Sequence, residues 1–184
     1  CYMRFRSDSA LNIDLTLYAP DVFKRKDDQE SALLWIFYGM LLVMLMYHLI
    51  LFFSVKDIGY LYYMLSIAFM LFLAMGLNGM SYQHLWPDNP WWERYNNPVM
   101  IGLTTAFFLQ FGRYYVDLRK MMRRADVVLK ALIVLCFTAG LSTLVLRNYR
   151  FSILATTAIT LVSMFYSIYI LTILTLVKKS RAAR

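Results

Sequence analysis

Charged residues are scarce in this sequence, and their scarcity excludes an ordinary soluble domain. Of the 184 residues, only 16% are Asp, Glu, Lys or Arg, and 60% are apolar. Soluble domains contain about 25% charged and about 45–50% apolar residues. The few charges are concentrated in short segments between long uncharged runs. Because about 20 apolar residues let a helix cross the roughly 30 Å hydrocarbon core of a bilayer, the pattern predicts a multi-pass membrane protein.

Cysteines and the usual catalytic motifs are also lacking. Cys1 and Cys136 cannot form a disulfide framework, and Cys136 lies in an apolar run where a small buried thiol is expected. There is no GxSxG, HExxH, P-loop or CxxC pattern, and two histidines do not make a metal site. All 11 acidic residues fall outside the predicted spans, so no intramembrane carboxylate is expected for a proton relay. We therefore expect no catalytic, cofactor-binding or metal-binding residue in this chain.

The first residues do not have a membrane pattern. Apolar and polar residues alternate through residues 2–18, with a turn-like Ser-Asp-Ser in the middle, which is typical of β-strands with one buried face. Two strands alone are barely stable. Since the chain has neither an initiator Met nor a signal peptide, we expect residues 1–23 to be the last strands of a domain that begins upstream. Residues 24–31 are predicted to be a charged linker.

Five uncharged or nearly uncharged runs follow, and they predict an all-α helical bundle over residues 32–177. Pro98 suits the first position of the third helix, and the last run is long enough to span with some tilt. Residues 178–184 are predicted to be a loop. The predicted membrane helices are residues 32–55, 60–80, 98–116, 127–146 and 151–177.

The distribution of Lys and Arg predicts the orientation, since positive residues accumulate on the cytoplasmic side. With the N-terminus outside, three basic residues face outward, and the charges near residues 24–26 are discounted because a folded domain ahead of a first helix is exported largely regardless of them. The net charge of +8 thus reflects topology and anionic lipids rather than nucleic acid. The cytoplasmic side would hold eleven basic residues: Lys56, Arg113, Arg119, Lys120, Arg123, Arg124, Lys130, Lys178, Lys179, Arg181 and Arg184.

Two polar positions near the spans have simple structural explanations. His48, in the first span, is predicted to be a hydrogen-bonded packing residue, with a ligand or a switch as the alternative. Asn78 and Gly79 are predicted to terminate the second helix. Lys130 lies one turn into its span and can extend its amine to the interface.

Two clusters are the candidate functional surfaces. The loop between the second and third spans is rich in tryptophan, and it is either an aromatic belt at headgroup level or a docking surface for an external domain. The basic connector after the third span is either an anchor for anionic headgroups or a docking site for a cytoplasmic domain, since an arginine fork can hold a carboxylate. The first cluster comprises Trp86, Trp91, Trp92 and His84, and the second comprises Arg119, Lys120, Arg123 and Arg124.

The order of short motifs resembles one family, the bacterial seven-transmembrane receptors with diverse intracellular signalling modules. The likeness covers nearly the whole chain and depends on the order and spacing of the motifs together. These motifs are LTLYAPDVF at residues 15–23, Tyr-Gly at 38–39, SVKD at 54–57, YLYY at 60–63, LNG at 77–79 and QHLWP at 83–87.

This resemblance implies a receptor in the bacterial inner membrane, with its N-terminus periplasmic and its C-terminus cytoplasmic. A periplasmic β-sandwich of carbohydrate-binding type would precede the bundle, and residues 1–23 would be its last strands. Two more helices and an output module would follow, either a histidine kinase, a diguanylate cyclase or a phosphatase, in two-component or cyclic-di-GMP signalling. The implied partners are lipids, these two domains and a second copy in a homodimer. A transporter or channel subunit for small solutes is the alternative.

Overall fold

A computed structural model describes residues 19–85, 87–146 and 149–182, and this part of the chain is entirely helical. The prediction of an all-α bundle is confirmed for these residues, whereas the strands predicted in residues 2–18 lie outside them. Two short helices, α3 (Met80–His84) and α5 (Leu118–Met121), lie between longer ones. The long helices are α1 (Pro20–Val55), α2 (Ile58–Leu77), α4 (Pro90–Tyr115), α6 (Arg123–Leu146) and α7 (Tyr149–Ala182).

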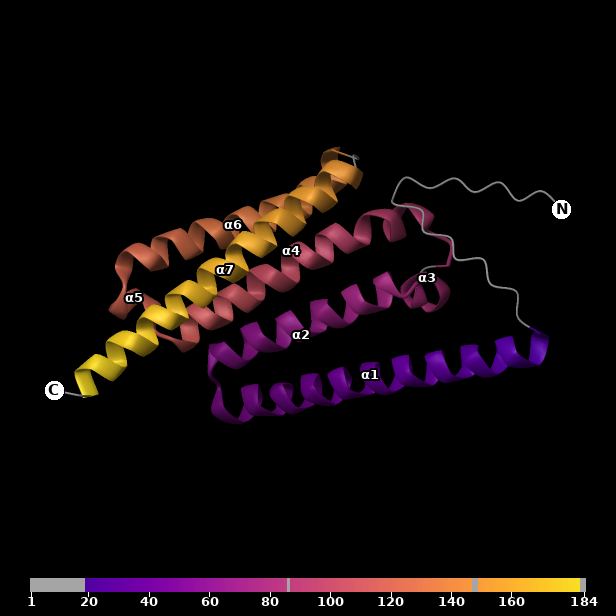
Figure 1. The fold of residues 1–184 in the computed structure, drawn as a ribbon, viewed down its shortest axis with the longest axis horizontal. Coiled ribbons are helices and arrows are strands. Elements are labelled where there is room, and N and C mark those ends of the chain that lie inside the picture. Colours follow the sequence, from indigo (N-terminus) through magenta and orange to yellow (C-terminus); the bar gives the residue numbers. More distant parts are fainter. Residues whose placement is uncertain (1–18, 86, 147–148, 183–184) are drawn as a thin grey trace.

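Four of the long helices, α1, α2, α6 and α7, are long and apolar enough to cross a membrane. Helix α4 overlaps the third predicted span but is less apolar, because its first two turns hold several polar residues and Gln110 and Arg113 interrupt its second half. It nevertheless lies in the middle of the bundle, packed against α2 on one side and against α6 and α7 on the other (Figure 1). The chain is therefore a multi-pass membrane protein with α4 as its central helix.

The helices run up and down, so the bundle has two ends. The first, here called the α3 end, holds the start of α1, helix α3, the start of α4 and the turn into α7 (Figure 1). The second, the α5 end, holds the α1–α2 turn, helix α5 and the end of α7 (Figure 1). Helix α1 lies at one edge and packs along α2.

Helices α4 and α6 approach closely because glycines face each other. A Cβ added to Gly102 would lie 2.7 Å from the Cys136 carbonyl oxygen and 3.0 Å from the Gly140 Cα. Small residues at such crossings are typical of membrane bundles, where packing and interhelical hydrogen bonds replace the hydrophobic effect. Such a bond joins α4 to α7, where the Thr105 and Thr160 hydroxyl oxygens lie 3.2 Å apart.

The first helix begins earlier than predicted. Residues 20–23, assigned to the preceding strands, and residues 24–31, assigned to a linker, form the first turns of α1. Pro20 occupies the first turn of the helix. Backbone N–H groups in this turn have no hydrogen-bond partner within the helix, so the N–H that proline lacks is not needed there. Lys26 and Glu30, 3.8 Å apart, form an i,i+4 pair that supports the helix despite the density of charge.

The prediction that Pro98 opens a helix is wrong. Pro90 opens α4 and Pro98 lies inside it. The cap explains the difference, because the Asn89 side chain accepts a hydrogen bond from the Trp92 backbone N–H at 3.3 Å. An internal proline is tolerated where neighbouring helices compensate for the lost bond, and Pro98 is fully buried among them. Residues 90–97, predicted to be a loop, are therefore helical.

The segments predicted as connectors at the α5 end are largely helical as well. Helix α6 begins at Arg123 rather than residue 127, and α7 continues through residues 178–182, which were predicted to be a loop. Lys, Arg and Ala are good helix formers, and positive charge at a helix C-terminus is favoured by the helix dipole. Hydropathy locates the edge of the apolar run, and the helix extends beyond that edge.

Candidate functional site

A buried ion pair joins α4 to α6 at the α5 end. Asp126, in the first turn of α6, is only 2% exposed. One carboxylate oxygen accepts a hydrogen bond from the Arg113 Nε of α4, and the other lies 3.1 Å from the Lys130 Nζ one turn further along α6. The Arg113 Nη1 also donates to the Gln110 side-chain oxygen at 3.1 Å. Both oxygens of the buried carboxylate are thus paired with cations.

This cluster places a buried acid on one of the helices that are long and apolar enough to cross a membrane. Asp126 was assigned to a basic connector, yet it lies in the first turn of α6, just ahead of the apolar run predicted to begin at residue 127. A buried carboxylate is tolerated only when it is paired and hydrogen-bonded, and here two cations meet that requirement. Two features of the sequence pointed to the cluster: the i,i+4 spacing of Asp126 and Lys130, and Arg113 as the one formal charge in the third predicted span.

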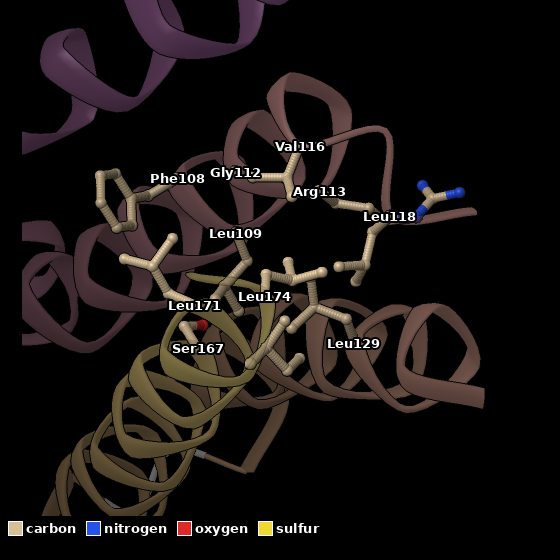
Figure 2. Close-up of a pocket in the computed structure, with 11 residues that line it drawn as sticks. Phe108, Leu109, Gly112, Arg113, Val116, Leu118, Leu129, Ser167, Leu171 and Leu174 are labelled. Atoms are coloured by element: carbon tan, nitrogen blue, oxygen red, sulfur yellow. The ribbon is translucent and has the colours of Figure 1, made fainter. Parts of the chain in front are cut away.

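An apolar cavity of about 140 Å³ lies beside the ion pair, between α4, α6 and α7. Figure 2 shows leucine side chains from these three helices converging on it, while the Arg113 guanidinium points away. Leu109, Leu129 and Leu174 are buried in the same core cluster. The α5 end therefore combines a paired charge with a mostly apolar cavity large enough for a small apolar group.

The four basic residues predicted as a coupling or anchoring surface lie at this end but outside the buried cluster. Arg119, Lys120, Arg123 and Arg124 are all exposed. The Lys120 Nζ lies 2.9 Å from an Asp117 carboxylate oxygen, and both side chains face solvent. The four side chains form an exposed basic rim around the helix ends, and both interpretations, anchor and docking site, require such exposure.

At the α3 end, two of the sequence motifs come together. The Asn78 side-chain amide donates to the Tyr38 hydroxyl oxygen at 3.2 Å and to the Ala74 carbonyl at 2.8 Å. The Tyr38 hydroxyl donates to the same carbonyl at 3.4 Å. Asn78 also ends α2, as predicted, and Gly79 follows with a φ of 71°. Asn78 therefore does more than terminate a helix, because it fastens α1 to α2.

The aromatic surface predicted at the α3 end is only partly described. His84, at the end of α3, places its ring edge-on against Trp35 of α1, with centroids 5.9 Å apart. Trp91 and Trp92 lie in the first turn of α4, and the Trp92 side chain is half-buried. Trp86 lies outside the described residues. His84 thus contacts α1, a contact that its position in a loop motif did not predict.

Buried polar groups at the interface of α2 and α4 form a third feature of the α3 end. Asn96 of α4 is fully buried, and neither its side-chain oxygen nor its nitrogen has a hydrogen-bond partner among the described residues. A Cβ added to Gly76 of α2 would lie 2.8 Å from that nitrogen. Gly76 thus provides the space in which the amide is buried.

Among the described residues, no group of three His, Cys, Asp or Glu side chains could hold a metal ion. His48 has a local role, because its Nδ1 lies 2.7 Å from the Met44 carbonyl oxygen, as expected for a packing residue.

The fold and these contacts define a class: a multi-pass helical membrane protein whose polar contacts fasten helices together at both ends of the bundle. The chain belongs to the 7TM diverse intracellular signalling family, whose sequence profile matches residues 30–184. Residues 30–184 therefore correspond to the membrane domain found in this family of signalling receptors. No curated protein and no solved structure matches the chain.

Proposed function

We propose that this chain relays a signal from a sensor domain on the periplasmic face of the bacterial inner membrane to an output module on the cytoplasmic face. In this proposal the chain itself catalyses nothing, and any kinase, cyclase or phosphatase chemistry belongs to the output module. The α3 end is the periplasmic end and the α5 end is the cytoplasmic end.

The course of α4 is the observation that carries the proposal. Trp91 and Trp92 lie in the first turn of this helix, next to the aromatic loop, and Arg113, bound to Asp126 beside the basic rim, lies in its last turn. The helix contacts α2, α6 and α7 along the way. Pro98 removes one backbone hydrogen bond within α4, but it is fully buried among the neighbouring helices. A displacement of the first turn can therefore pass to the last turn through this packed core. The two predicted coupling surfaces are therefore joined by one helix.

A transporter would use its intramembrane charge differently. Transport sites lie near the bilayer midplane, where discontinuous helices expose backbone groups to the substrate. Asp126 lies instead in the first turn of α6, with both carboxylate oxygens occupied by cations. This arrangement favours a structural role for Asp126 and supports the receptor over the transporter.

The proposed orientation predicts which ends of the bundle a reagent reaches. Cysteines placed at Asp88 and Arg123, both exposed, in a chain with Cys1 replaced by Ser, should label from opposite sides. In whole cells a membrane-impermeant maleimide should modify the cysteine at 88 and not the one at 123. Cys136 is 1% exposed and should not interfere. Labelling of position 123 from outside would reverse the orientation.

The proposed relay predicts that the double substitution of Trp91 and Trp92 by Leu uncouples the intact receptor. Insertion should be preserved because leucine is among the residues that enter a bilayer most favourably. The output activity should no longer respond to the stimulus, because the contact of the sensor with the first turn of α4 is lost. The measurement is the stimulated-to-basal ratio of output activity in membranes, expected to fall to about one.

The matched control is Phe151→Leu, an exposed aromatic residue at the same end of the bundle, which should signal normally. If the tryptophan variant also responds normally, these residues serve only as an aromatic belt. Solute uptake into proteoliposomes containing the chain would instead favour the transporter.

A further inference from the structure

A cavity on the opposite side of α4 from the ion pair has the dimensions of a ligand site. It is partly open and has a volume of about 500 Å³ between α1, α2 and α4, beside the α1–α2 turn at the α5 end. Pockets for small ligands commonly measure about 300–1,000 Å³. The cavity lies near the end of the bundle and is partly open, so that lipid headgroups and soluble molecules could both reach it.

The wall of this cavity is mostly aromatic. The His48 and Tyr63 ring centroids are 4.5 Å apart, and the Tyr63 and Phe111 centroids are 4.9 Å apart. These contacts join α1, α2 and α4 into one continuous aromatic surface. Aromatic faces carry negative electrostatic potential and attract cations, most of all organic ammonium groups. The six rings that line the cavity are His48, Tyr60, Tyr63, Phe111, Tyr114 and Tyr115.

One carboxylate completes the lining. Asp57 caps α2, and its side chain accepts a hydrogen bond from the Gly59 backbone N–H at 2.9 Å. The Tyr114 ring lies close to the same turn, because a Cβ added to Gly59 would be 3.0 Å from the Tyr114 Cδ1 and 3.4 Å from the Asp57 Oδ1. The carboxylate is therefore adjacent to the aromatic wall. The described residues that line this cavity include no Lys or Arg. The fixed charge of the site is therefore negative.

The His48 ring is oriented by a backbone contact. The His48 Nδ1 lies 2.7 Å from the Met44 carbonyl oxygen, and a carbonyl only accepts, so Nδ1 carries the proton. In the neutral ring Nε2 is then an acceptor. A site lined by aromatic rings and one carboxylate repels anionic ligands. An apolar ligand would leave the carboxylate without a counter-ion. A cationic ligand therefore suits the site better than an anionic or an apolar one.

We propose that this cavity binds an organic ammonium group, held over the aromatic faces by cation–π attraction and oriented by Asp57. The group comes from one of two sources, the headgroup of phosphatidylethanolamine or a soluble quaternary amine. The site is independent of the proposed relay, because its test needs neither a stimulus nor an output module.

The test uses Asp57→Asn in the full chain, reconstituted in nanodiscs. Asparagine is as good a helix cap as aspartate and keeps the oxygen that accepts from Gly59, so the variant removes charge and little else. In nanodiscs of phosphatidylglycerol alone, choline is titrated by calorimetry against its neutral isostere, 3,3-dimethylbutan-1-ol. In nanodiscs of mixed phosphatidylethanolamine and phosphatidylglycerol, native mass spectrometry measures the lipid retained by the chain. Asp117→Asn, an exposed acid at the same end, is the matched control.

Two results support the proposal and identify the source. A soluble amine is the source if the wild type binds choline more tightly than the neutral isostere, and if Asp57→Asn binds choline about tenfold more weakly than the wild type does. Selective retention of phosphatidylethanolamine, lost in Asp57→Asn and kept in Asp117→Asn, assigns the lipid. The proposal is overturned if the wild type prefers neither choline over its isostere nor phosphatidylethanolamine over phosphatidylglycerol, or if Asp57→Asn behaves as the wild type in both measurements.

Discussion

Replacing Asp126 with Asn is expected to destabilise the bundle by about 3 kcal/mol, near the lower end of the range for breaking a buried ion pair. The substitution keeps the shape of the side chain and removes its charge. Arg113, whose side chain is 18% exposed, is then left without a counter-ion at the interface of α4 and α6. Lys130 is half-exposed and can turn to water, so it contributes little to the loss. The measurement is the free energy of unfolding in mixed micelles, from titration with a denaturing detergent.

Two companion variants make this result specific. Asp117→Asn removes a surface pair with Lys120 in the same connector, and asparagine tolerates the positive φ of 52° at that position. It should cost no more than about 1 kcal/mol. The double variant Arg113→Met with Asp126→Leu removes both charges at once, and it should recover most of the stability because apolar residues can replace a buried ion pair. Equal losses for Asp126→Asn and Asp117→Asn would contradict the pairing.

The long apolar helices could be predicted from the sequence because hydropathy is a local property. A run such as residues 60–80 has to be shielded from water whatever its neighbours are, so its composition alone indicates a span. The helix boundaries were less predictable. The same composition does not show that α1 begins at Pro20, or that Asn89 caps α4 ahead of Pro98, because helices extend into polar flanks where caps and ion pairs support them.

The contacts between helices could not be predicted for a different reason. Arg113 and Asp126 lie 13 residues apart on separate helices, and Tyr38 and Asn78 lie 40 apart. Their pairing depends on which faces of the helices meet, and this is set by tertiary packing. Because charged residues were assigned to the segments between apolar runs, Asp126 was assigned to a connector. The motif residues Tyr38 and Asn78 were noticed singly, and only the fold shows that they bind each other.

The crossing of α4 and α6 also depends on packing, and it is expected to be as sensitive to substitution as the ion pair. Replacing Gly102 with Ala should destabilise the bundle by about 1–3 kcal/mol, the usual range for overpacking. The new methyl group would lie 2.7 Å from the Cys136 carbonyl oxygen, and a backbone atom cannot move aside as a side chain can. The two helices would have to separate, with loss of packing along their length.

Two glycines provide the control series for this prediction. Gly112, on the same helix, has nothing within 4 Å of an added Cβ, so Gly112→Ala should stabilise α4 by up to about 1 kcal/mol through helix propensity alone. Gly140 would meet its nearest neighbour at 3.4 Å, an ordinary contact, so Gly140→Ala should fall between the two. Unfolding titrations of the three variants should therefore rank Gly112→Ala most stable and Gly102→Ala least stable. If Gly102→Ala is as stable as Gly112→Ala, the two helices do not meet at Gly102. The expected ranking would show that α4 and α6 approach closely at Gly102.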